Sequence, residues 1–235
     1  MDITASDIYS FYNTKLGQIL KRYIRQQINS NINLQGPLSI CGYGYTEPYL
    51  SFLSKQENEN QYVECIPDFL DGSVNQNLNY DQKNIHEYFL PLDPSSIDIV
   101  ISTHLLELVE KPKSSIEEVW RILKPNGLFI AVVPRRAGLW TRYDNNPFGY
   151  GRSYSSMQFR ELIKNYMVLD NKKSFIHFPP WNHYLNYKFH PTLEKTGEII
   201  FPFIGGLMIL VCKKIVYATN KKRQKKIPIK NIVTT

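Results

Sequence analysis

The pattern of apolar and polar positions between residues 95 and 134 predicts a strand, a helix and a second strand. Residues 97–101 (Ile-Asp-Ile-Val-Ile) form a β-branched run typical of a strand buried in a parallel sheet. A helix is predicted to start behind Pro112, where Ser114-Ser115-Ile116-Glu117 has the form of a capping box, and its apolar residues follow at helical spacing. Residues 124–127 (Lys-Pro-Asn-Gly) end that helix, and residues 128–134 form the next strand. A unit of this kind implies a right-handed parallel crossover.

The same alternation extends over most of the chain. Apolar residues three and four apart predict one amphipathic helix over residues 6–28. Further strands are predicted at 38–44, 61–67, 173–178 and 206–214, with helices at 48–55 and after a Ser155-x-x-Gln158 capping box. Residues 199–212 are 14 mostly apolar residues, fewer than the ~20 that span a bilayer, so a buried strand is favoured. Together these elements predict one α/β domain over residues 1–217.

Cysteine usage and charge narrow the functional classes. Cys41, Cys65 and Cys212 lie in apolar runs, as expected of reduced core residues in a cytoplasmic protein, and residues 1–4 do not resemble a signal peptide. The net charge is +7, but eight Lys and Arg residues follow Cys212 without any acid, so residues 1–212 carry 7 − 8 = −1. A near-neutral body argues against a nucleic-acid enzyme. The basic tail, residues 218–235, is predicted to be disordered and suits weak contact with anionic lipid or RNA.

Several short blocks resemble class I S-adenosylmethionine-dependent methyltransferases. They are Leu90-Pro91-Leu92, residues 96–100, Leu105-Leu106-Glu107 and, most specifically, residues 118–127 (Glu-Val-Trp-Arg-Ile-Leu-Lys-Pro-Asn-Gly). The resemblance implies a three-layer, Rossmann-like α/β fold with a seven-stranded sheet, mostly parallel with a C-terminal antiparallel hairpin. Over residues 7–217 the chain also resembles a narrower bacterial group of methyltransferase-like proteins.

A strand, a turn and a helix at residues 37–55 carry two glycines, Gly42 and Gly44. Glycine lets the backbone reach positive φ and approach a ligand closely, and the following helix offers free N–H groups. The resemblance implies that Gly42, Tyr43 and Gly44 hold the methionine and ribose parts of S-adenosylmethionine. Ile40 stands where the family has an acid, so a tight turn that binds no ligand is the alternative.

Three further residues are candidates for cofactor binding. Glu64 lies 20 residues after Gly44, a spacing that also suits a nicotinamide-binding protein. The family commonly ends this strand in a ribose-binding acid, but Ile66 is found here. The resemblance places Glu87 near the adenine, and Thr103 at the end of the fourth strand. For Glu64 and Glu87, a solvated carboxylate is an equally supported alternative. No metal site is predicted.

The predicted acceptor site comprises the end of the fourth strand and the loop after the fifth, because open α/β sheets bind ligands at the carboxyl ends of their strands. A histidine at such an end could act as a general base or could be structural. Arginines and aromatic residues in the loop could recognise a small anionic or aromatic molecule, or could simply pack. The candidates are His104, Arg135, Arg136, Trp140, Arg152 and Tyr154.

Three functions remain open at this point. The first is methyl transfer to a small acceptor, in which alignment of donor and acceptor supplies much of the catalysis, so no catalytic side chain is assigned. The second is a catalytically degenerate methyltransferase-fold protein that serves as a binding or assembly module, which the missing acids at positions 40 and 66 favour. The third is a nicotinamide oxidoreductase, disfavoured because Glu47 stands at its third glycine. The first is preferred.

Overall fold

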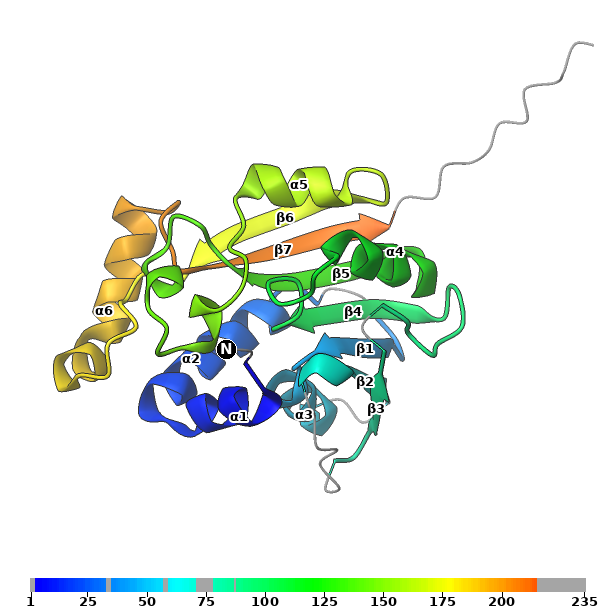
Figure 1. Ribbon diagram of the computed structural model, residues 1–235, viewed down its shortest axis with the longest axis horizontal. Helices are drawn as coiled ribbons and strands as arrows, with labels where there is room; N and C mark the ends of the chain where they lie inside the picture. The colour runs from blue at the N-terminus through cyan, green and yellow to red at the C-terminus, as the bar shows by residue number, and fades with distance from the viewer. Residues whose placement is uncertain (1–2, 33–34, 57–58, 71–77, 87, 215–235) are drawn as a thin grey trace, which may run out of the picture.

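A seven-stranded sheet forms the centre of the protein in the computed structural model, which describes residues 3–32, 35–56, 59–70, 78–86 and 88–214. The strand order is β3-β2-β1-β4-β5-β7-β6 (Figure 1). Strands β1 to β5 pair in parallel, whereas β7 is antiparallel to both β5 and β6. The mostly parallel sheet with a C-terminal antiparallel hairpin is therefore confirmed. The strands are β1 (Ser39–Gly44), β2 (Gln61–Pro67), β3 (Asp81–Ile85), β4 (Ile97–Thr103), β5 (Leu123–Pro134), β6 (Met167–Phe175) and β7 (Leu207–Lys214).

Helices cover both faces of the sheet. On one face the core includes residues of α1 (Ala5–Asn13), α2 (Lys15–Asn29) and α3 (Glu47–Gln56). On the other face it includes residues of α4 (Pro112–Ile122) and α5 (Ser156–Ile163). A sixth helix, α6 (Tyr184–Ile200), lies at the end of the molecule where β7 begins (Figure 1). Short 3₁₀ helices are η1 (Asp68–Leu70), η2 (Leu139–Arg142) and η3 (Pro147–Gly149).

The two cores arise from alternation along the central strands. Ile40 and Ile99 belong to the core beneath α1 to α3, while their neighbours Cys41 and Val100 belong to the core beneath α4 and α5. Successive side chains of a strand point to opposite faces, and a strand covered on both faces is apolar throughout. This explains why these strands appear in the sequence as continuous apolar runs.

The helix predicted over residues 6–28 is instead two helices, which is a correction to the sequence analysis. Thr14 has an extended backbone, with ψ of 160°, and its side chain accepts a hydrogen bond from the Gly17 N–H at the start of α2. A Cβ on Gly17 would lie 2.0 Å from the Phe11 carbonyl oxygen, so the two helices meet closely at this bend. The apolar spacing continues across Thr14, and periodicity alone therefore did not reveal the break.

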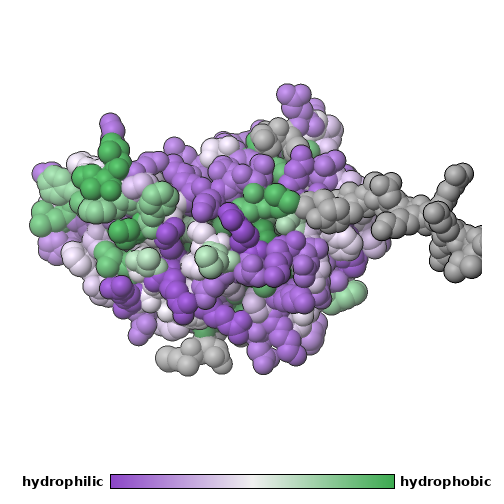
Figure 2. Space-filling view, turned by 90° about the horizontal axis from the view of Figure 1, so that it is seen from above, coloured by the Kyte–Doolittle hydropathy of each residue, from purple (hydrophilic) through white to green (hydrophobic). Residues whose placement is uncertain are grey.

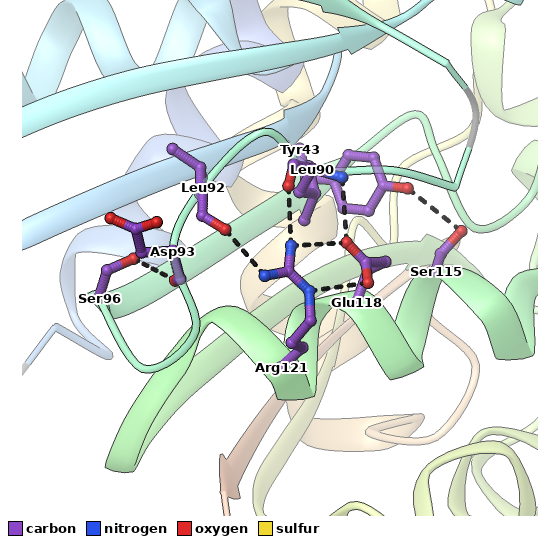
Figure 3. A network of polar contacts seen from close by, with 8 residues as sticks. All are labelled: Tyr43, Leu90, Leu92, Asp93, Ser96, Ser115, Glu118 and Arg121. Atoms are coloured by element: carbon purple, nitrogen blue, oxygen red, sulfur yellow. Dashed lines mark hydrogen bonds and ion pairs between the residues drawn. The ribbon is translucent and has the colours of Figure 1, made fainter.

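The capping box predicted at Ser114 is also wrong. Helix α4 begins at Pro112, a favoured first helical residue, and has no side-chain cap. Glu118 and Arg121 on α4 instead hold the preceding loop (Figure 3). The Arg121 guanidinium donates to the carbonyl oxygens of Leu90 and Leu92, both at 2.8 Å. Within residues 118–127, the segment that most resembles the family, Glu118 and Arg121 therefore connect α4 to the loop before β4. By contrast, the Ser155 capping box of α5 is confirmed.

The structure corrects two further segments. The edge strand β3 lies in an Asn-rich segment for which the sequence analysis predicted no strand. Helix α6 was not predicted either, and Ile199 and Ile200 belong to it rather than to the buried strand favoured over residues 199–212. The predicted basic tail, residues 218–235, lies outside the described residues.

Candidate active site

The carboxyl ends of β1 and β4 form the edge where the cofactor site was predicted. Gly44 and Thr103 are register partners there, and both are buried. The Tyr45 N–H donates to the Thr103 carbonyl oxygen at 3.0 Å, and the Thr103 hydroxyl donates to the Tyr45 carbonyl oxygen. The polar groups of Thr103 thus bind the turn after β1.

The two glycines of this turn are needed for packing within the protein. Gly44 has φ of +104°, and a Cβ on it would lie 2.4 Å from the Thr103 carbonyl oxygen. A Cβ on Gly42 would lie 2.0 Å from Thr46 Oγ1. Both the left-handed conformation and the close approach therefore require glycine without any ligand. Tyr43, between them, is fully buried, and its hydroxyl donates to Ser115 on α4.

Glu64, on β2, binds Thr46 at the end of this turn. Its Oε1 accepts hydrogen bonds from the Thr46 N–H at 2.8 Å and the Thr46 hydroxyl at 2.9 Å, and its Oε2 accepts from Gln82 at 2.8 Å. Burial raises the pKa of Glu64, although these hydrogen bonds oppose the shift. The carboxylate faces the start of α3, where the helix dipole favours negative charge. Glu64 is therefore buried rather than solvated, and its oxygens are committed to the protein.

His104 leaves β4 in the left-handed conformation, with φ of 51°, and lies in a buried aromatic cluster. Its Nε2 is 2.8 Å from the Tyr12 hydroxyl, which is 2.6 Å from the Tyr49 hydroxyl. The ring centroid of Phe148 is 4.3 Å from that of His104. Burial raises the pKa of both Tyr12 and Tyr49, so both phenols stay protonated. Sequence analysis singled out neither tyrosine, because their apolar spacing resembles that of core residues.

Glu107 is a second residue that the sequence analysis missed as a functional candidate. Its carboxylate is fully buried, with Oε1 at 3.5 Å from His104 Nδ1. Within the described part of the chain, neither carboxylate oxygen has a hydrogen-bond partner, and His104 Nδ1 also lacks one. A buried carboxylate without a hydrogen-bond partner is destabilising, and such groups are characteristic of functional sites. The His-x-x-Glu spacing at the end of a strand was the signal in the sequence.

Helix α1 covers this cluster and carries Tyr12. Its first turn is fixed by a capping box in which Thr4 and Asp7 exchange hydrogen bonds. A cleft of about 290 Å³ lies along the line where α1 meets residues 144–150, and Asp7 and Phe11 line its α1 side. The N-terminal helix thus lies over the carboxyl edge of the sheet, as a lid would.

The predicted acceptor residues are distributed among several environments. Trp140 is fully buried and its indole N–H donates to the Phe178 carbonyl oxygen at 2.8 Å. The Tyr154 hydroxyl donates to the Leu106 carbonyl oxygen beside Glu107, and Arg152 donates to the Glu110 carbonyl oxygen. Arg136 is exposed, and Arg135 points to Ser174 on β6. His104 and Tyr154 lie near Glu107, and the Arg152 N–H donates to the Glu107 carbonyl oxygen at 2.7 Å. Glu87 lies outside the described residues.

Residues 38–131 match the model of a methyltransferase domain. No curated protein matches the chain in sequence. The matched residues run from the start of β1 into β5 and include the Gly42–Gly44 turn, His104 and Glu107.

Solved methyltransferase structures share the fold of this chain. One is a SAM-dependent methyltransferase from Aquifex aeolicus, with TM-score 0.60, 14% identity, and coverage of 91% of this chain and 100% of that one. A possible histamine N-methyltransferase from Thermotoga maritima has TM-score 0.57 and 14% identity, covering 84% and 92%. Geranyl diphosphate C-methyltransferase from Streptomyces coelicolor A3(2) has TM-score 0.58 and 12% identity, covering 84% and 80%. At these identities the similarity shows the fold alone.

The residues that the sequence analysis assigned to S-adenosylmethionine, the cofactor of class I methyltransferases, make their described contacts within the protein. Gly42, Gly44 and Thr103 are buried against the protein's own atoms, and the Thr46 N–H is bound by Glu64. Tyr12, from α1, contacts His104 at the carboxyl edge of β4. Tyr12 also stacks on Tyr45, so α1 lies beside the end of the glycine turn. In the described part of the chain, no group of three His, Cys, Asp or Glu side chains could hold a metal ion.

Proposed function

We propose that the protein is an S-adenosylmethionine-dependent methyltransferase that transfers a methyl group to a small acceptor. Support comes from the methyltransferase domain at residues 38–131 and from the fold shared with solved methyltransferases. One of these, geranyl diphosphate C-methyltransferase, was solved with S-adenosylhomocysteine and geranyl diphosphate. An anionic or aromatic acceptor stays a prediction from the arginines and aromatic residues of the loop after β5.

Helix α1 acts as the lid of the donor site in this proposal. The observation that carries it is the position of the Tyr12 hydroxyl, between His104 Nε2 at 2.8 Å and the Tyr49 hydroxyl at 2.6 Å. These contacts hold α1 over the carboxyl edge of β1 and β4. Thr14, the extended residue between α1 and α2, provides a hinge. In the open state the glycine turn is accessible, and His104 is available as a general base oriented by Glu107.

A lid of this kind makes a quantitative prediction about donor affinity. A ligand that binds only the open state has an apparent affinity reduced by the fraction of open molecules. Tyr12→Phe keeps the ring and removes the hydroxyl that joins α1 to His104 and Tyr49. Since a hydrogen bond contributes about 0.5–1.5 kcal/mol net, this change should raise affinity for S-adenosylhomocysteine about two- to tenfold.

Calorimetric titration with S-adenosylhomocysteine tests the proposal on the wild type, Tyr12→Phe and the control Tyr9→Phe. Tyr9 lies on the same helix but is 57% exposed, so its variant should bind like the wild type. Tighter binding by Tyr12→Phe alone supports the lid. Equal affinity in all three proteins would rule out the lid but not the methyltransferase.

A catalytically degenerate binding module is the second candidate function. Ile40 and Ile66 take the places of two acids that the family commonly uses, and Glu64 occupies the N–H of Thr46 at the start of α3. If the protein is such a module, neither the wild type nor the Tyr12→Phe variant should bind S-adenosylhomocysteine. That result would reject methyl transfer in favour of this alternative.

A further inference from the structure

Helix α6 differs from most surface helices of a globular domain because its buried residues are polar and many of its apolar residues are exposed. Its two buried residues are polar, Asn186 and Glu194. Asn186 donates to the carbonyl oxygens of Pro179 and Trp181, and Glu194 accepts from the backbone N–H groups of residues 176 and 177. A helix on a globular surface normally turns its apolar residues inward. The inner side of α6 is thus anchored by polar groups together with Tyr187, which packs against the core, while most of its other apolar residues face outward.

These outward residues form a contiguous surface, which we call the α6 apolar face. Figure 2 shows apolar residues gathered at the end of the molecule where Figure 1 places α6. Ile199 is 72% exposed and Phe203 is 70% exposed. Patches of this kind on a soluble domain mark interaction sites. Within the described residues, the face includes Tyr184, Leu185, Phe189, Ile199, Ile200 and Phe203.

A cationic pocket adjoins the α6 apolar face. This pocket, of about 190 Å³, is lined by Arg135, Lys172 and Lys173 and shares Phe203 with the face. Glu198 also lines it and pairs with Lys173 at 2.7 Å, so three cations face one carboxylate. The Arg135 guanidinium donates to Ser174, and its buried Nε has no partner among the described residues. The pocket therefore has an excess of positive charge and an unused donor.

We propose that the α6 apolar face and the cationic pocket together form a docking surface for an anionic lipid bilayer. Aromatic and aliphatic side chains of the face would enter the boundary between headgroups and acyl chains, as in helices that lie in the membrane plane. The pocket would bind a lipid phosphate by charge-assisted hydrogen bonds. The exposed Lys188 and Lys195 of α6 add attraction to an anionic surface. No described helix is long and apolar enough to cross a membrane, so the contact is peripheral.

Charge favours a lipid surface over a second copy of the chain. A two-fold dimer buries the same patch from both copies. It would therefore bring the excess cations of both pockets into one interface, where like charges repel. An anionic lipid instead supplies the missing negative charge. This inference does not depend on methyl transfer, because the surface shares no residue with the Tyr12, His104 and Tyr49 cluster. Arg135, an acceptor candidate in the sequence analysis, instead contacts Ser174 on β6.

Vesicle flotation at about 0.15 M salt tests the docking surface on the full chain. The vesicles contain phosphatidylcholine alone or with phosphatidylglycerol. Because Ile199 and Phe203 are largely exposed, the double variant Ile199→Ser/Phe203→Ser should fold normally. It should partition into the anionic vesicles about tenfold less than the wild type. The matched control, Met157→Ser/Phe89→Ser, changes residues that are 77% and 62% exposed elsewhere and should bind like the wild type.

A second pair of variants tests the pocket. Arg135→Gln/Lys172→Gln should lose the preference for anionic over neutral vesicles, whereas Lys113→Gln, at an exposed lysine on α4, should keep it. Every variant retains the basic tail. Unchanged binding by Ile199→Ser/Phe203→Ser would therefore assign vesicle binding to the tail and overturn the proposal.

Two other results would also overturn it. The first is a concentration-dependent dimer in size-exclusion chromatography that Phe203→Ser dissociates, together with no vesicle binding, because the face would then pair two copies. The second is thermal protection by glycerol 3-phosphate that Arg135→Gln/Lys172→Gln removes, again without vesicle binding. The pocket would then bind a soluble phosphate ester rather than a lipid.

Discussion

At the scale of single residues, the turn after β1 shows how one motif can serve packing and ligand binding alike. Gly42 and Gly44 match family glycines, yet the structure requires both because protein atoms occupy the space of their missing side chains. Glu64 also serves packing, because its carboxylate, a candidate for cofactor binding, accepts a hydrogen bond from the Thr46 N–H. Substitutions at these positions are therefore expected to lower the stability of the fold as well as the affinity for any ligand.

The first prediction concerns Gly44→Ala. Gly44 and Gly36 both have positive φ, of +104° and +88°, but a Cβ on Gly36 would meet nothing within 4 Å. The two alanine variants share the backbone strain, and only Gly44→Ala adds a clash with Thr103. Gly44→Ala should therefore lower the free energy of unfolding by about 1–3 kcal/mol more than Gly36→Ala does. Urea unfolding measures both, and equal losses would contradict the close approach of Gly44 to Thr103.

The second prediction concerns the pH dependence of stability at Glu64. Its pKa is raised by burial above the ordinary value of 4.5, so the folded protein retains a proton that the unfolded chain releases. Stability from this group is therefore present below pH 4.5 and is lost as the pH rises through the folded pKa. Glutamine does not titrate. The difference in Tm, wild type minus Glu64→Gln, should shrink between acidic and neutral pH, and a difference that grows would contradict it.

At the scale of elements, helix ends depend on contacts that periodicity does not contain. The bend at Thr14 divides one predicted helix into α1 and α2. Helix α4 begins at Pro112 without the capping box predicted at Ser114, and Glu118 and Arg121 tie it to the preceding loop. Burial raises the pKa of Glu118, but hydrogen bonds from Arg121 and the Leu90 N–H outweigh it, so the net pKa is lowered.

The third prediction tests this tie between α4 and the loop before β4. Arg121→Gln removes hydrogen bonds to Glu118 and to two carbonyl oxygens, and should lower the free energy of unfolding by about 1.5–3 kcal/mol. Lys164 and Glu161 form an exposed ion pair at the same spacing, so Lys164→Gln should lower it by less than ~1 kcal/mol. Denaturant unfolding compares them. Similar losses would show that the Arg121 contacts to the carbonyl oxygens contribute little.

At the scale of the whole molecule, the sheet brings together residues from distant parts of the chain. Tyr12 and His104 are 92 residues apart in sequence and 2.8 Å apart in the structure. By contrast with the sheet, residues 218–235 have no apolar periodicity, and they carry much of the positive charge. The body and the tail are therefore expected to contribute very differently to stability.

The fourth prediction is that truncation after Ala218 changes the Tm little. Six like charges and no apolar periodicity give the segment too little apolar surface to offset the entropy of ordering it. Differential scanning calorimetry of the full and truncated chains measures the change. A fall of many degrees would mean that the tail packs on the body.

The sequence by itself determined the features whose causes are local. Continuous apolar runs predicted most strands, apolar residues three and four apart predicted helices, and the Ser155 capping box predicted the start of α5. Residues 118–127 indicated the methyltransferase fold because they tie α4 to its neighbouring loop and strands. These patterns arise from short stretches of chain and can be interpreted without knowing the rest of the fold.

Only the tertiary structure decided which side chains meet at the carboxyl edge and which apolar residues stay exposed. The Tyr12, His104 and Tyr49 contacts depend on α1 folding back over β1 and β4. The apolar residues at 199–204 suggested a buried strand, yet α1 to α5 already cover the sheet, and α6 anchors itself through polar groups. Burial is a property of what the whole fold leaves uncovered, and no local pattern can specify it.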